Sequence, residues 1–165
     1  RRQRQMCIRD RQKADLAASF PTEKDAILPW AEKQFSKNIL FTQRARNSLR
    51  KFDGKPDCAI ICDGILYLDA YARFRQGSLD SETFALYSER YCWNITFCGA
   101  EALRVYNHDY LAQTADGKKY LLNMHIKYGV KVQELVRIYF CWDDALQKVI
   151  LGYLPDHLPT LKDPT

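Results

Sequence analysis

The chain has 165 residues, of which 47% are hydrophobic and 27% charged, and its formal net charge at pH 7 is +5. This length and composition are typical of one globular domain with a substantial core, without repeats or low-complexity tracts. No apolar run approaches the ~18 residues of a membrane span, so we expect no membrane partner. Gly-rich phosphate loops, Gly-x-Ser-x-Gly, His-Glu-x-x-His and the dinucleotide fingerprint are also missing from the sequence, which argues against the enzyme classes that use them.

The first eleven residues differ in composition from the rest of the chain. They hold five arginines and one aspartate, so residues 12–165 carry a net charge of only +1. Met6–Arg11 (Met-Cys-Ile-Arg-Asp-Arg) looks like the translation of a transposon-end adapter used to prepare sequencing libraries. We interpret residues 1–11 as a non-native leader, with a genuine basic arm as the alternative. Residues 12–165 then form one domain, or the C-terminal part of a longer protein, and the overall charge no longer favours nucleic-acid binding.

Helices are predicted over residues 13–19, 22–35, 43–52, 65–76 and 81–91. Pro29 is expected to kink or split the second of these helices. Thr42 is a suitable N-cap for the third helix and Asp80 or Ser81 for the last. The apolar run Cys58–Cys62 is too short for its periodicity to distinguish a helix from a strand.

Strands are predicted over residues 39–41, 93–98, 104–106, 110–114, 118–127, 134–142 and 148–154. Gly117 lies in a hairpin turn between two of them, because the turn needs a residue that accepts a positive φ. The last three segments read as an antiparallel meander. The predicted fold is therefore α+β, with N-terminal helices packed on a C-terminal antiparallel sheet.

Two of these last strands sort their side chains by face, because side chains alternate with period two along a strand. On one face lie the apolar residues Tyr120, Leu122, Met124, Ile126, Val136, Ile138, Phe140 and Trp142. On the other face lie His125, Lys127, Arg137 and Tyr139. We expect these polar residues to line up on one side of the sheet, where they form the best candidate site of the chain.

Six cysteines do not indicate a disulfide framework in this sequence. One of them, Cys7, lies in the leader, and the others number five. Their spacings lack the Cys-x2-Cys pattern of zinc sites, and no histidine pair has finger spacing, so no metal is expected. Free cysteine behaves as a small hydrophobic residue. We therefore expect buried, reduced thiols in a cytoplasmic protein without a cofactor.

The end of the chain resembles that of the RelE/ParE-type toxins over residues 118–158. The resemblance rests on four pieces: His125-Ile-Lys-Tyr-Gly, Val136-Arg-Ile-Tyr139, Val149-Ile-Leu-Gly-Tyr153 and the tail residue His157. Members of this family pack N-terminal helices against such a sheet, and they either cut ribosome-bound messenger RNA or poison gyrase. The resemblance implies RNA or the ribosome as a partner, and a protein antitoxin or an upstream domain as another.

Cleavage of RNA by its own 2′-hydroxyl needs a proton acceptor, a cation near the phosphate and an acid for the leaving oxygen. Arg137 and Lys127 can supply the charge, His125 or His157 can transfer protons, and Tyr139 can stack on a base. Each residue also has a structural interpretation. Arg137 can bridge to a nearby acidic residue (Asp143 or Glu134), Tyr139 can pack in the core, and His157 can pin the C-terminal turn.

A second candidate surface lies on the predicted helix 43–52. Its outward cations can bind the phosphates of a nucleic acid, or they can form an ordinary solvated helix face; they are Arg44, Arg46, Arg50 and Lys51. Two functional hypotheses follow from these surfaces. One is a RelE-like toxin or toxin-derived ribonuclease, and the other is a non-catalytic protein-interaction or regulatory domain of a bacterial or phage protein.

Overall fold

The computed structural model describes residues 13, 15–131 and 134–164, and its sheet and helices have the α+β arrangement predicted above. The helices are α2 (Lys24–Phe35), α3 (Gln43–Lys51), α4 (Cys58–Arg75), α5 (Ser81–Leu86), α6 (Ala100–Val105) and the 3-10 helix η1 (Asn107–Tyr110). The strands are β1 (Ile39–Phe41), β2 (Thr96–Phe97), β3 (Leu111–Gln113), β4 (Lys119–Leu121), β5 (Met124–Tyr128), β6 (Val136–Asp143) and β7 (Lys148–Tyr153). Residues 15–18 are also helical, as predicted.

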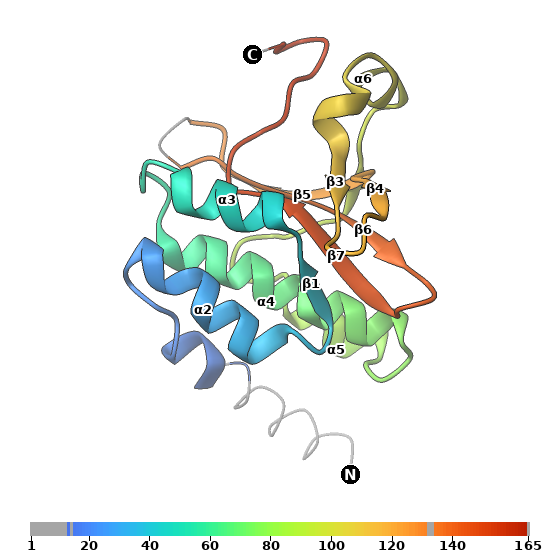
Figure 1. Ribbon diagram of the computed structural model, residues 1–165. Helices are drawn as coiled ribbons and strands as arrows, with labels where there is room; N and C mark the ends of the chain where they lie inside the picture. The colour runs from blue at the N-terminus through green and yellow to red at the C-terminus, as the bar shows by residue number, and fades with distance from the viewer. Residues whose placement is uncertain (1–12, 14, 132–133, 165) are drawn as a thin grey trace.

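Five strands form the main sheet in the order β1-β7-β6-β5-β2, and β3 pairs with β4 in a separate hairpin (Figure 1). The predicted meander is confirmed, since β5, β6 and β7 are consecutive antiparallel neighbours. The sheet is nevertheless mixed rather than wholly antiparallel. Strand β1 joins it in parallel to β7, and β2 extends the opposite edge in the antiparallel sense.

The main core lies between one face of this sheet and helices α2, α3 and α4 (Figure 1). The sheet contributes the predicted apolar face of β5 and β6, with Ile126 and Ile138 fully buried. Helix α4 packs closely against β6 at Gly64, where an added Cβ would come within 2.7 Å of the Ile138 side chain. Glycine therefore sets the distance between helix and sheet at this point.

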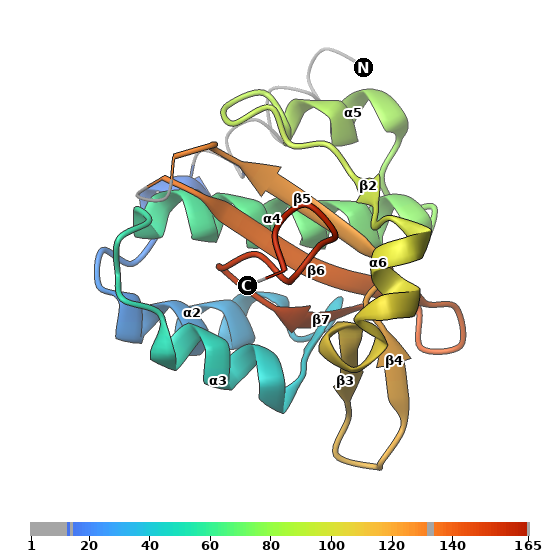
Figure 2. The ribbon, with the colours of Figure 1, turned by 90° about the horizontal axis from the view of Figure 1, so that it is seen from above.

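A second, smaller core covers the opposite face of the sheet, where α6, η1, the β3–β4 hairpin and the C-terminal segment lie (Figure 2). Its buried members are Ala102, Tyr110, Ala112, Leu122, Tyr139 and Leu158. The predicted polar face of the meander is thus partly covered. Only part of it remains open to ligands.

The helix predictions were partly wrong at their boundaries. Helix α4 begins at Cys58, because the Asp57 carboxylate accepts from the Ala59 N–H at 3.0 Å and caps the helix. All residues from Ile60 to Ala72 are buried, so the apolar pattern had no single-face periodicity. The last predicted helix ends at Leu86 rather than at residue 91. Pro29 lies inside α2 without splitting it.

Three strand predictions were also wrong in part. Residues 104–106 are not a strand, because the helix formers before them start α6, which continues to Val105. The segment 93–98 pairs with the sheet only at Thr96–Phe97. The segment 118–127 divides into β4 and β5, and Leu122 at the break belongs to the second core. Its predicted common face with Met124 and Ile126 does not exist.

The described cysteines are free, as predicted, but only Cys62 and Cys141 are buried. Cys58 and Cys98 are half-buried and Cys92 is exposed. Residues 1–11, including the predicted leader and Cys7, lie outside the described residues. No helix in the described part of the chain has the length and apolar character needed to cross a membrane.

Candidate functional site

The C-terminal tail, defined as residues 154–164, runs back across the polar face of the meander (Figure 2). The backbone N–H of Arg137 donates to the Pro155 carbonyl at 2.7 Å. The N–H of Leu158 donates to the hydroxyl of Tyr139 at 2.9 Å. These bonds fix the tail to β6 and leave a pocket between tail and sheet.

This tail pocket has a volume of about 780 Å³, which is within the range of small-ligand sites. All five residues predicted for the site line it: His125, Lys127, Arg137, Tyr139 and His157. The strand register explains the convergence. On β5 and β6, His125 lies opposite Tyr139 and Lys127 lies opposite Arg137, so the four side chains share one face.

His125 is held in a half-buried position against the Tyr139 ring, with 5.5 Å between the ring centroids. Burial is the main cause that lowers its pKa to about 4, and the positive charges of Arg137 and Lys127 add to the effect. The imidazole is therefore neutral near pH 7. A neutral imidazole has one ring nitrogen that can accept a proton.

The neighbouring thiol indicates which nitrogen this is. The Cys98 thiol donates to the Leu122 carbonyl at 3.5 Å, and its Sγ lies 3.5 Å from Nδ1 of His125. Because burial raises the pKa of Cys98 to about 12, the thiol keeps its single proton, which is used in the bond to Leu122. With the thiol proton on the Leu122 carbonyl, Nδ1 donates to Sγ and Nε2 is the proton acceptor.

Arg137 binds backbone carbonyls rather than the carboxylates of Asp143 or Glu134. Its Nη1 donates to the carbonyls of Tyr128, Gly129 and Val136, at 3.1, 3.2 and 3.0 Å. Its Nη2 also donates to Gly129, at 3.2 Å. No described residue accepts from Nε or from the second Nη2 hydrogen. These two donors form one edge of the guanidinium, the geometry that binds a phosphate or carboxylate in a bidentate way.

Lys127 is exposed and lines the same pocket. Among the described residues, no carboxylate forms an ion pair with Lys127 or with Arg137. Like charges directly opposite each other on neighbouring strands are destabilising. The pair therefore places two positive charges side by side, and an anion is favoured at this point of the tail pocket. The lining as a whole balances three cations with three carboxylates: Lys127, Arg137, Lys162, Glu101, Asp156 and Asp163.

Tyr139 and His157 both hold the tail. The Tyr139 side chain is buried, and its hydroxyl is engaged by Leu158. Burial raises its pKa to about 12, so the hydroxyl stays protonated. His157 is half-buried, with Nε2 at 3.3 Å from the Asp163 carboxylate and Nδ1 at 3.3 Å from the Leu158 carbonyl. Both partners are acceptors, so both ring nitrogens can donate when the ring carries a proton.

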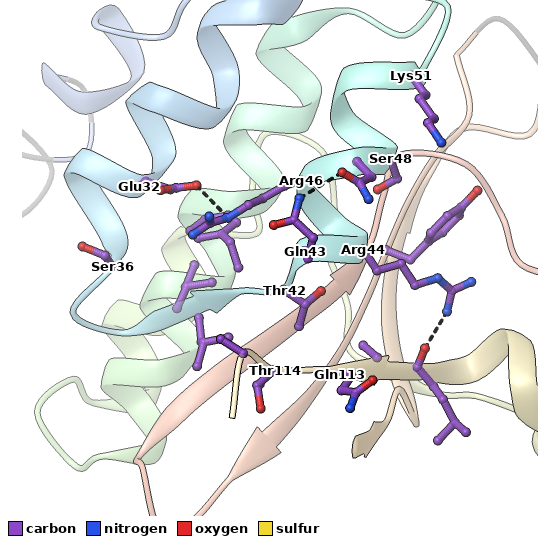
Figure 3. A pocket seen from close by; sticks show the side chains of 18 of the residues that line it. Glu32, Ser36, Thr42, Gln43, Arg44, Arg46, Ser48, Lys51, Gln113 and Thr114 are labelled. Carbon is purple, nitrogen blue, oxygen red and sulfur yellow. Dashed lines mark hydrogen bonds and ion pairs between the residues drawn. The ribbon is translucent and has the colours of Figure 1, made fainter. Parts of the chain in front are cut away.

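A second cavity, the α3 groove, lies between α3, β1 and β3 (Figure 3). Its volume is about 1190 Å³. Of the residues predicted to bind nucleic acid, Arg44, Arg46 and Lys51 line the groove. Arg50 is exposed on α3 and does not line it.

Two of these three cations already have partners. Arg44 donates to the carbonyls of Asp109 and Leu111, and its guanidinium lies 4.8 Å from the centroid of the Tyr153 ring. Arg46 forms an ion pair with Glu32 at 3.1 Å. Lys51 has no carboxylate partner among the described residues. Of the four predicted α3 cations, Arg44 and Arg46 are thus held by other parts of the fold, whereas Arg50 and Lys51 are exposed to solvent.

The described residues contain no group of three or more His, Cys, Asp and Glu side chains that could hold a metal ion. Comparison with protein-family models, curated proteins and solved structures gave no match. The resemblance to RelE/ParE-type toxins therefore stays a prediction. The site has to be interpreted from its own geometry.

Sequence reasoning missed several residues of the tail pocket. Cys98 contacts His125 because β2 pairs with β5, bringing Thr96 opposite His125. Pairing the predicted strand 93–98 with the segment that contains His125 would have indicated this contact. Asp156 and Asp163 enter from the tail, whose path across the sheet has no signal in the sequence.

Proposed function

We propose that the protein is a RelE-like ribonuclease that cleaves RNA in the tail pocket without a metal ion. The observation that carries the proposal is the pair of cations Lys127 and Arg137, which lack a carboxylate partner among the described residues and offer one free guanidinium edge. A neutral imidazole lies in the same pocket, and His157 supplies a second ring. An anion site with two proton-transfer groups is the arrangement that phosphodiester cleavage requires.

In this reaction the ribose 2′-oxygen attacks the adjacent phosphorus, the bond from phosphorus to the 5′-oxygen breaks, and a 2′,3′-cyclic phosphate forms. Nε2 of His125 takes the proton of the 2′-hydroxyl. His157, when protonated, exchanges its contact with the Asp163 carboxylate for one with the leaving 5′-oxygen and gives that oxygen a proton. Arg137 and Lys127 stabilise the negative charge on the non-bridging oxygens. Tyr139 fixes the tail and the His125 ring rather than stacking on a base.

The test is incubation of the purified full chain with an oligoribonucleotide in the presence of a chelator, followed by mapping of the product ends. We expect products with a 2′,3′-cyclic phosphate and no cleavage at a nucleotide that lacks its 2′-hydroxyl. His125→Gln should abolish cleavage. His108→Gln is the matched control, since His108 is exposed on η1 and does not line the tail pocket. A folded protein that leaves every RNA intact would refute catalysis.

A specific observation favours the alternative of a non-catalytic interaction domain. Two apolar side chains line the tail pocket in exposed positions, Val130 at 89% and Leu161 at 57% exposure. Exposed apolar residues beside polar groups are typical of protein-binding surfaces. Growth arrest on controlled expression, relieved by an Arg137→Ala, His125→Ala double variant that remains folded, would favour the ribonuclease. The absence of arrest from a folded parent would favour the interaction domain.

A further inference from the structure

The tail pocket and the α3 groove are neighbours. Asp156 lines both of them, and it lies just after the end of β7. Tyr153, which lines the α3 groove, packs against Tyr139 of the tail pocket with 6.4 Å between ring centroids. A chain-like ligand bound in one cavity can therefore continue into the other.

The charges of the α3 groove favour a polyanion. Its lining includes four cations and two carboxylates: Arg44, Arg46, Lys51, Lys148, Glu32 and Asp156. Glu32 is already paired with Arg46. Lys148 donates to the Ser36 carbonyl at 3.1 Å, and neither Lys148 nor Lys51 has an ion-pair partner among the described residues. Two positive charges are thus left to bind phosphates.

Side-chain amides and hydroxyls also project into the α3 groove. Figure 3 shows Gln43 on one wall and Gln113 and Thr114 on the opposite wall. Thr42 lies between them, but its buried hydroxyl donates to the Leu151 carbonyl and accepts from the Ala45 N–H, so it is not available to a ligand. The other groups can hydrogen-bond to the edges of unpaired bases. At the crossing between the cavities, the Asp156 carboxylate repels a phosphate but accepts a hydrogen bond from a ribose hydroxyl or a base amino group.

We infer that the α3 groove binds the continuation of the same RNA strand, so that the substrate is single-stranded RNA extending from the tail pocket past Asp156. This inference rests on the proposed function, since it identifies the strand through the reaction in the tail pocket. The phosphates of the flanking nucleotides contact Lys51 and Lys148. The bases face the amides of α3 and of the β3–β4 hairpin.

An extended peptide is the other occupant to consider, because the edge strands β1 and β3 both line the α3 groove. The Leu111 carbonyl of β3 is already bound by Arg44, which leaves it one lone pair for an added strand. The charges favour RNA. Cations without carboxylate partners match a polyanion better than the main chain of a peptide.

The test measures how affinity depends on the length of the RNA. Binding of oligouridylate to the full chain carrying His125→Gln is followed by fluorescence anisotropy, for a dinucleotide and a dodecanucleotide. We expect the dodecanucleotide to bind at least about ten-fold more tightly, because several phosphates and bases add to the binding. Lys51→Glu and Lys148→Glu should each reduce this length dependence and lower the salt slope by about 0.7 for each phosphate that is no longer neutralised.

Arg50→Glu is the matched control, because it makes the same charge change one residue away from Lys51, outside the α3 groove. Retention of the length dependence in Arg50→Glu and its disappearance in Lys51→Glu would support the inference. Equal effects of the two variants, or equal affinity for both lengths, would overturn it. If the inference is overturned in this way but the unmodified protein still cleaves a dinucleotide, the proposed function stands. RNA binding that depends on Lys51 but not on Arg50, without cleavage by the parent protein, would support RNA binding in the α3 groove and refute the proposed catalysis.

Discussion

Lys127 and Arg137 lie directly opposite each other on β5 and β6, and no described carboxylate pairs with either. Repulsion between such neighbours costs free energy of folding, by an amount comparable to other cross-strand pairs. A position that weakens the fold while creating a binding surface is typical of functional residues. Stability and activity should therefore respond in opposite directions when the pair is changed.

Lys127→Gln tests this opposition. We expect the free energy of unfolding to rise by about 0.2–1 kcal/mol, because the repulsion between like charges on neighbouring strands is relieved. RNA cleavage should fall at the same time, because one cation no longer binds the phosphate. Urea unfolding and kcat/KM for an oligoribonucleotide measure the two effects. A decrease in both stability and activity would show that Lys127 supports the fold instead.

The neutral state of His125 makes stability dependent on pH. Its pKa is about 4 in the folded protein and near 6.5 in the unfolded chain, so the unfolded chain binds more protons between these values. Above pH 6.5 the His125 side chain is neutral in both states. The free energy of unfolding falls as the pH decreases from 6.5 towards 4, because protonation favours the unfolded chain. Urea unfolding at a series of pH values should show this decline.

His125→Gln should flatten the decline in that pH range, whereas His108→Gln should retain it, since His108 is exposed outside the tail pocket. An unchanged pH dependence in His125→Gln would assign the decline to other groups.

The Tyr139 hydroxyl fixes the tail over the sheet. Tyr139→Phe keeps the ring against His125 but leaves the Leu158 N–H without its acceptor. We expect the free energy of unfolding to fall by about 1–3 kcal/mol, because a buried donor becomes unpaired. Faster hydrogen exchange at Leu158 would be the local signature.

Tyr153→Phe is the matched control for this hydroxyl, because no described residue hydrogen-bonds to the Tyr153 hydroxyl. It should cost little stability and leave exchange at Leu158 unchanged. If both variants are destabilised to the same extent, the hydrogen bond to the tail is not the cause.

Gly152 lets Leu122 pack against β7. An added Cβ at Gly152 would lie 2.3 Å from Cδ2 of Leu122, which no ordered side chain tolerates. Gly152→Ala should therefore lower the free energy of unfolding by about 1–3 kcal/mol, as other overpacked sites do. Gly99→Ala is a suitable comparison, because a Cβ there meets no atom within 4 Å.

A double-mutant cycle with Leu122→Ala can assign the cost of Gly152→Ala to this close approach. The double variant should be less destabilised than the sum of the single variants. Strict additivity would mean that the strain lies elsewhere in the second core.

The meander and its polar face could be predicted from the sequence because both depend on local patterns. Alternation along β6 sorts Ile138 from Arg137, and short turns connect the strands, so the register brings His125 and Tyr139 together. The four predicted site residues on β5 and β6 line one pocket for this reason, and His157 joins them only through the path of the tail. Their chemical roles remain a prediction.

Features that depend on distant segments could not be predicted in this way. The parallel pairing of β1 with β7, the path of the tail and the contact of Cys98 with His125 join segments that share no local pattern. The first part of helix α4 could not be predicted for another reason, since a helix buried on all sides has no amphipathic period.

The junction of β1 and β7 has a kinetic consequence. Thr42 bonds to the Leu151 carbonyl across a separation of 109 residues, whereas β5, β6 and β7 follow one another along the chain. Closing so long a loop is entropically costly, so local hairpins are expected to form before it closes. The strands under the tail pocket can thus assemble early in folding. The α3 groove, whose walls include β1, takes shape only when the first third of the chain docks on the last strand.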